Sequence, residues 1–146
     1  RLAALRAQSA ALPRAPSVFF EVRYPNLLGA GGQSILTEVI AAAGGANCLA
    51  ARRERLVRLS EEVLLLLDPD IYIVQTGAMN PAPGHPETRP LFRALKAVRQ
   101  EAVLFVAEER FSRPGPGAVD AAEELAAFLR EWAKRARPGG NTANSP

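Results

Sequence analysis

Three short apolar runs, rich in β-branched and aromatic residues, constrain the fold of this chain more than any other feature. They cover residues 18–22, 71–74 and 103–106. Runs of this length and composition predict buried β-strands, and the segments between them have helical spacing. Strands that alternate with helices form parallel sheets covered on both faces. The sequence therefore predicts an α/β fold: a single Rossmann-like lobe with a mainly parallel sheet and helices on both faces.

Capping residues and hydrophobic spacing predict where the helices begin and end. The predicted helices run from Ser34 to Gly44, from Ser60 to Asp68, around 91–95 and over about 118–136. Two further segments lack this spacing: residues 46–58 are basic, and residues 77–90 are dense in proline. We expect the first to be irregular and the second to be a loop.

The composition is that of an ordinary globular domain, and it excludes some functions. Of the 146 residues, 48% are hydrophobic and 23% are charged, and the formal net charge is +3. Basic residues gather at 52–58 and 134–137 without interleaved aromatic residues, so nucleic-acid binding is not expected. No apolar run reaches the roughly 18 residues that a membrane span needs. The chain starts without Met, and we expect it to be a piece of a longer protein.

No pattern in the sequence indicates catalysis. A Gly-rich turn at 29–32 follows the first strand, but a dinucleotide fingerprint would need glycine where Ser34 stands. His85 is the one histidine, and no nucleophile elbow accompanies it, so we expect an exposed loop histidine and leave a ligand role open. Cys48 is alone and is expected to be a half-buried structural thiol. The acidic residues form no metal cluster. We therefore expect no resident cofactor and no metal site.

The predicted topology also selects a binding edge. Parallel sheets bind ligands where the carboxyl ends of their strands meet. In this chain the rule points to the turn after Val22, the loop after Val74 and the segment after Val106.

Four sequence motifs follow one another in an order typical of one family. They are a Gly-Gly-x-Asn segment at 44–47, a Ser-x-Glu helix start at 59–63 with a Pro-Asp strand at 68–74, a Leu-x-Ala-Val-Arg segment at 95–99 and an Arg-Pro-Gly-Pro segment within 111–116. In this order the chain resembles the C-terminal lobe of the periplasmic binding proteins for cobalamin, ferric siderophores and haem. The resemblance covers residues 17–135.

This resemblance implies a domain organisation and a function. Residues 17–136 would be the C-terminal substrate-binding lobe, residues 1–12 the tail of an interlobe helix, and residues 137–146 a disordered tail. The N-terminal lobe of the same protein would supply the other half of a pocket for a metal chelate. The protein would then be periplasmic or otherwise extracytoplasmic, would not be an enzyme, and would deliver its ligand to the membrane permease of an ABC importer.

The resemblance also implies roles for particular residues. The ligand-binding residues would be Tyr24, Leu28, Leu56, Gln75, Thr76, Met79, Phe111 and Arg113. Arg113 would pair with carboxylates or phenolate-type oxygens of the chelate. Glu62 would dock onto arginines of the permease, although the helix dipole alone also favours an acid there. Departures are Leu56, where some relatives have a large aromatic residue, and Gly117, where the family motif has arginine.

Two other interpretations stay open. One is an α/β enzyme or cofactor-binding domain, which would need an acid–base pair near residues 29–32 or His85. The other is a ligand-sensing module with the same fold and no role in transport.

Overall fold

A mixed β-sheet forms the centre of the lobe in the computed structural model, which describes residues 15–111 and 116–136. In this part of the chain the sheet has six strands: β1 (Ser17–Arg23), β2 (Leu28–Ala30), β3 (Ala46–Asn47), β4 (Leu56–Arg58), β5 (Ile71–Thr76) and β6 (Val103–Ala107). Their order is β4-β2-β1-β5-β6, and β3 pairs with the start of β1. The expected segments 1–12 and 137–146 lie outside the described residues.

The three strands predicted from apolar runs form the parallel frame of the sheet. Val18 to Glu21 of β1 lie opposite Ile71 to Val74 of β5, and β5 pairs in parallel with β6. The residues of β1 from Val18 to Val22 are buried, as are those of β5 from Ile71 to Gln75. The predicted α/β fold is confirmed.

Three short strands were missed by the sequence analysis: β2 and β4 pair antiparallel, and β3 pairs in parallel with β1. The supposed turn at 29–32 begins inside β2, and the segment 46–58, expected to be irregular, contains β3 and β4. Gly29 is needed in β2 because a Cβ there would lie 2.6 Å from Cε1 of Phe19. A glycine that permits close packing in a strand therefore resembled a glycine that permits a turn.

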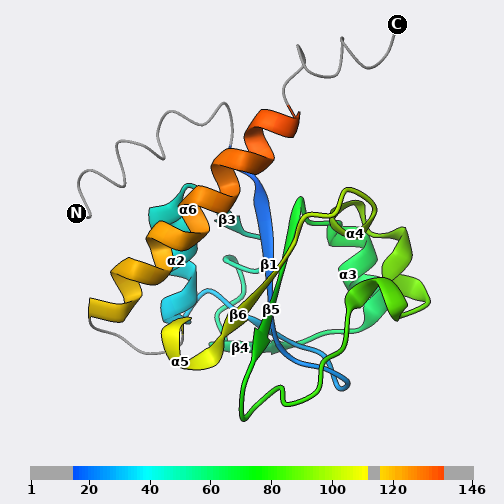
Figure 1. Cartoon of the computed structure of the whole chain (residues 1–146). Helices are drawn as coiled ribbons and strands as arrows, with labels where there is room; N and C mark the ends of the chain where they lie inside the picture. Colours follow the sequence, from blue (N-terminus) through cyan, green and yellow to red (C-terminus); the bar gives the residue numbers. More distant parts are fainter. Residues whose placement is uncertain (1–14, 112–115, 137–146) are drawn as a thin grey trace, which may run out of the picture.

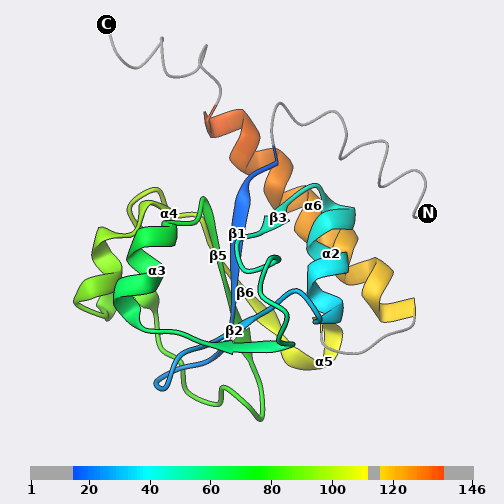
Figure 2. The same cartoon turned by 180° about the vertical axis from the view of Figure 1, so that it is seen from behind.

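Helices cover both faces of the sheet. They are α2 (Ile35–Ala43), α3 (Glu61–Leu67), α4 (Lys96–Arg99), α5 (Glu108–Phe111) and α6 (Pro116–Ala136), with 3₁₀ turns η1 (Pro86–Thr88) and η2 (Leu91–Ala94). Figures 1 and 2 show α2 and α6 on one side of the sheet and α3 and α4 on the other. None of the described helices has the length and apolar character to cross a membrane.

The predicted helix caps of α2 and α3 are confirmed. Ser34 Oγ accepts a hydrogen bond from the Leu36 N–H at 3.1 Å, and Ser60 Oγ accepts one from Val63 at 3.1 Å. Gly44 ends α2 with a φ of 103°. The helix expected around 91–95 is instead a 3₁₀ turn followed by the single turn of α4, and α5 was not predicted.

Two polar residues of the family motifs tie separate segments together. The Asn47 side-chain amide donates to the Ala30 carbonyl at 2.9 Å, and its oxygen accepts from the Leu49 N–H at 3.0 Å. Asp70 Oδ2 accepts from the Ser17 N–H at 2.9 Å and so joins the start of β1 to the start of β5. Both motif residues therefore have a structural role: their hydrogen bonds join segments at the sheet.

Candidate functional site

A hollow lies at the edge where the predicted binding rule places a ligand. Nine residues line it: Val22, Ser34, Ile35, Leu36, Arg55, Leu56, Gln75, Met79 and Glu108. Val22, Gln75 and Glu108 come from the carboxyl ends of β1 and β5 and from the residue after β6. The hollow has a volume of about 200 Å³ and is open to solvent on one side.

Three of the expected ligand-binding residues, Leu56, Gln75 and Met79, line this hollow. Leu56 is half-buried, Gln75 is buried, and Met79 is 40% exposed. Their roles stay predictions.

The other expected ligand-binding residues lie elsewhere or outside the described part. Leu28 is buried in β2, and Thr76 is half-buried at the end of β5, where its hydroxyl donates to the Val106 carbonyl at 3.1 Å. Phe111 is 1% exposed and packs on Phe20, with ring centroids 6.0 Å apart. It belongs to the core because α5 turns it inward. Arg113 lies outside the described residues.

Two charged residues of the hollow were not singled out from the sequence. Arg55 directly precedes Leu56, and Glu108 directly follows β6. The rule that ligands bind at the carboxyl ends of parallel strands could have identified Glu108. Arg55 gave no such signal, because β4 is too short to be recognised and Arg55 is one of four arginines between residues 52 and 58.

The Gly-rich segment after β2 holds the basic segment against the rim of the hollow. The Gly31 N–H donates to the Arg55 carbonyl at 2.8 Å, and the Gly32 N–H donates to the Arg52 carbonyl at 2.9 Å. A Cβ at Gly31 would lie 2.2 Å from the Glu54 carbonyl oxygen, so only glycine allows this approach. These N–H groups are occupied by protein carbonyls, which argues against a phosphate-binding loop.

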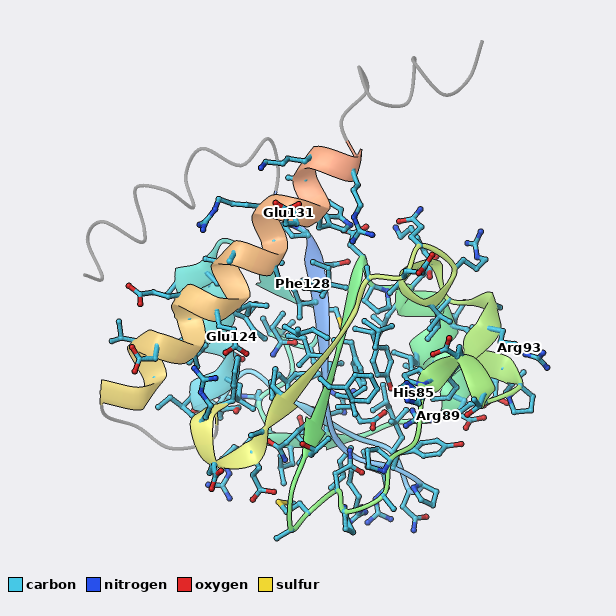
Figure 3. All side chains as sticks on the ribbon, viewed as in Figure 1. His85, Arg89, Arg93, Glu124, Phe128 and Glu131 are labelled. Carbon is cyan, nitrogen blue, oxygen red and sulfur yellow. The ribbon has the colours of Figure 1, made fainter. Side chains whose placement is uncertain are left out.

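A buried polar cluster is centred on Glu21, the residue before Val22 in β1. Its carboxylate is fully buried and accepts two hydrogen bonds from Arg89, at 2.6 and 3.2 Å. The Tyr72 hydroxyl and the Asn80 side-chain amide also donate to it, at 2.5 and 2.9 Å. Burial and the Glu21 charge raise the pKa of Tyr72 well above its ordinary value. Figure 3 shows Arg89 on the α3 side of the sheet.

The cluster fixes two loops that follow β1 and β5. The Tyr24 N–H donates to Asn80 Oδ1 at 2.9 Å, and the Arg89 guanidinium lies 3.5 Å from the centroid of the Tyr24 ring. Arg89 also donates to the Pro83 carbonyl at 2.8 Å. Tyr24 is therefore held against this cluster, and Asn80, the neighbour of Met79, is anchored to the sheet.

His85 and Cys48 lie apart from the residues that line the hollow. His85 is exposed, as expected, with its ring 5.0 Å from that of Phe105 and Nδ1 3.6 Å from Glu87. Cys48 is half-buried, as expected, and burial raises the pKa of its thiol to about 12. Among residues 15–111 and 116–136, no three side chains of His, Cys, Asp or Glu form a group that could hold a metal ion.

Comparison with known proteins identifies solved structures with a similar fold. No protein-family model and no curated protein matches the chain. The periplasmic heme-binding protein RhuT from Roseiflexus sp. RS-1 matches with a TM-score of 0.78 and 25% identity, over 90% of this chain and 52% of RhuT. The periplasmic vitamin B12 binding protein BtuF of Vibrio cholerae matches with a TM-score of 0.77 and 25% identity, over 91% of this chain and 51% of BtuF.

A third structure, an ABC-type Fe3+-hydroxamate transport system from Saccharomonospora viridis DSM 43017, has a TM-score of 0.65 and 23% identity. The match covers 87% of this chain and 47% of the Saccharomonospora chain, and it shows similarity of fold alone. This chain thus spans about half the length of these proteins.

The fold is that of one α/β lobe of a periplasmic solute-binding protein. The resemblance expected from the sequence motifs, to the C-terminal lobe of the periplasmic binding proteins for cobalamin, ferric siderophores and haem, is confirmed.

Proposed function

We propose that this chain is the C-terminal lobe of the substrate-binding component of an ABC importer for a metal chelate such as cobalamin, a ferric siderophore or haem. The observation that carries the proposal is the open hollow at the carboxyl edge of the sheet, in a lobe whose fold matches heme- and vitamin B12-binding proteins. The protein would work outside the cytoplasm and would bind its ligand without transforming it.

The lining of the hollow suits the organic body of a chelate. Five of the nine lining side chains are aliphatic or thioether groups: Val22, Ile35, Leu36, Leu56 and Met79. Such surfaces bury the apolar parts of a ligand, while a few polar groups fix its orientation.

The size of the hollow supports a shared pocket. Sites for small molecules enclose about 300–1,000 Å³, whereas this hollow has about 200 Å³ and an open side. A second lobe closing over that side would complete a site of the usual size. The isolated lobe would make only part of the contacts, and we expect its affinity to be weak.

Binding can be tested on this chain by two-dimensional NMR, which detects millimolar affinities. Cobalamin, a ferric siderophore and haem are each added up to their solubility limits. We expect at least one of them to shift or broaden the resonances of residues that line the hollow. No perturbation by any of the three would overturn the proposal.

A matched pair of variants locates the site. Met79→Asp places a charge in the hollow, and Leu66→Asp places one on α3, where Leu66 is 86% exposed and does not line the hollow. We expect Met79→Asp to weaken binding about tenfold and Leu66→Asp to leave it unchanged within about twofold. Equal effects of the two variants would argue against this site.

Permease docking through Glu62 is part of the proposal. Glu62 lies in the first turn of α3, is exposed, and has no ion pair within the described part of the chain. An exposed acid on a rigid helix start suits pairing with arginines of a membrane subunit. A ligand-sensing module with the same fold would bind the chelate without this contact. An assay of chelate transport therefore distinguishes an importer component from a sensing module.

The rival interpretation as an enzyme or cofactor-binding domain has less support. The N–H groups of Gly31 and Gly32 are already bonded to carbonyls, and His85 pairs with Glu87 at the exposed surface, away from the residues that line the hollow.

A further inference from the structure

We propose that the hollow selects chelates that present an anionic oxygen group, and that Arg55 is the residue that recognises it. This inference rests on the proposed function and adds the charge of the ligand to it. Arg113, to which the family resemblance gives this task, lies outside the described residues.

The hollow has two charged residues, and they differ in whether their side chains are already hydrogen-bonded to the protein. Arg55 and Glu108 are the two charged residues among those that line it. Glu108 Oε1 accepts a hydrogen bond from the Met79 N–H at 3.1 Å. It also lies against Gly77, where a Cβ would be 2.7 Å from the same oxygen. One oxygen of the Glu108 carboxylate is thus hydrogen-bonded to the main chain of the loop after β5.

Arg55 is placed at the hollow by its main chain and leaves its side chain unpaired. Its carbonyl accepts from the Gly31 N–H at 2.8 Å, which fixes the position of the residue. The guanidinium is exposed and makes no ion pair or hydrogen bond among the described residues. A residue with a fixed main chain and a free guanidinium in a hollow can donate hydrogen bonds to an anionic oxygen.

The neighbours of Arg55 strengthen the positive potential at this rim. Between residues 52 and 58 the chain has four arginines and one glutamate. Arg52 pairs with that glutamate, Glu54, at 3.2 Å. Arg53 and Arg58 are exposed and have no ion pair in the described part of the chain. Clustered charges of one sign raise the local concentration of oppositely charged ligands.

The chemistry then distinguishes between classes of chelate. A carboxylate or catecholate oxygen gains a charge-assisted hydrogen bond with Arg55, which a neutral amide or ester group cannot match. A neutral ligand that covers Arg55 removes water from the guanidinium and returns only weaker hydrogen bonds to uncharged oxygens. The hollow therefore favours an anionic chelate over a neutral one of the same shape.

Matched ligand pairs test this charge preference. The probes are haem and its dimethyl ester, cobalamin and its monocarboxylate, and a ferric tris-catecholate and a neutral ferric tris-hydroxamate. Each is titrated into the wild-type chain and into Arg55→Gln, Arg55→Lys and Arg53→Gln, with NMR spectra to verify the fold. Arg53 is the control, because it is exposed in the same segment and does not line the hollow.

We expect the anionic member of the pair that binds to bind more tightly. Arg55→Gln should weaken it about tenfold and leave the neutral member unchanged within about twofold, and Arg55→Lys should retain part of the difference. Arg53→Gln should change either affinity less than about threefold. Added salt should weaken the anionic member more than the neutral one.

Two kinds of failure are distinguishable. Equal binding of anionic and neutral members, or equal effects of Arg55→Gln and Arg53→Gln, would overturn the charge preference and leave the chelate-binding function standing. Binding of none of the six probes would overturn the proposed function and the charge preference with it.

Discussion

Arg89 and Glu21 form a two-point ion pair inside the lobe, with Nη1 and Nη2 of the arginine 2.6 and 3.2 Å from the two carboxylate oxygens. Glu21 is fully buried and Arg89 is 4% exposed. The pair joins the central strand β1 to the loop that follows β5, across 68 positions of sequence. Together with Asn80, whose side-chain amide also donates to Glu21, it attaches this loop to the sheet.

Breaking this pair on one side should strongly destabilise the lobe. Removing one partner leaves an uncompensated buried charge, so we expect Arg89→Met to lower the free energy of unfolding by about 3–5 kcal/mol. Urea denaturation measures the change. Arg93→Met, at an exposed position of η2, is the control and should change it by less than about 0.5 kcal/mol.

The double variant separates charge burial from packing. Glu21→Gln combined with Arg89→Met removes both charges, and it should be more stable than Arg89→Met alone. A double variant that is no more stable than Arg89→Met would contradict this account of the cluster.

Substitution of Gly31 should disturb the rim of the hollow. In Gly31→Ala the new methyl group would lie 2.2 Å from the Glu54 carbonyl oxygen, so the basic segment must move. We expect a loss of about 1–3 kcal/mol in urea denaturation and NMR shifts at residues 52–55. In Gly117→Ala, at the start of α6, the nearest atom of the described residues would be the Arg110 carbonyl oxygen, 4.0 Å from the new methyl group. That control should gain up to about 1 kcal/mol from helix propensity.

The sequence predicted the frame of the lobe because its signals are local. The runs at 18–22, 71–74 and 103–106 are each long enough to show a strand. Strands β2 and β4 have three residues each, too few to establish a period, and they form through pairing with β1 and with each other. Length therefore decided which strands could be predicted.

Part of the site was predictable, from the family resemblance at Leu56 and at two residues that also follow the end of a predicted strand. Gln75 and Met79 follow the β5 run and do line the hollow. Phe111 follows β6 but faces the core, because a single turn of helix decides its direction and an apolar residue suits either side. The pairing of Glu21 with Arg89 left no trace in the spacing of the sequence, since the two partners are far apart and either could have been exposed.

The thiol of Cys48 should be unreactive in the native lobe. Burial raises its pKa from 9.0 to about 12, so almost no thiolate is present near neutral pH. We expect iodoacetamide at pH 8 to modify the native chain at least tenfold more slowly than the chain in urea. Equal rates would show that the thiol is accessible and ionised as in a free peptide.

The same pKa shift predicts a loss of stability in alkali. The folded state binds the Cys48 proton more tightly than the unfolded state, so this contribution is present below pH 9 and declines between about pH 9 and 12. Its slope is at most about 1.4 kcal/mol per pH unit. Urea denaturation of the wild type and of Cys48→Ala over this range should give a shallower decline for the variant.

Reversal of charge at Glu62 should separate transport from binding. In Glu62→Arg we expect chelate binding to stay within about twofold of wild type, because Glu62 does not line the hollow. Uptake of the chelate through the complete importer should fall by at least tenfold, since like charges would meet at the permease. Glu38→Arg, an exposed acid in the first turn of α2, is the control and should transport normally. Normal uptake by Glu62→Arg would exclude the docking role.

The basic segment is fastened to the lobe through its carbonyl oxygens, which receive the N–H groups of Gly31 and Gly32. None of these bonds depends on which side chain stands at residues 52–55. These side chains can therefore be substituted one at a time during evolution. The sheet, the two glycines and the cluster around Glu21 need not change with them. A change of ligand would then appear as substitutions at a few exposed positions, while the rest of the lobe keeps its sequence.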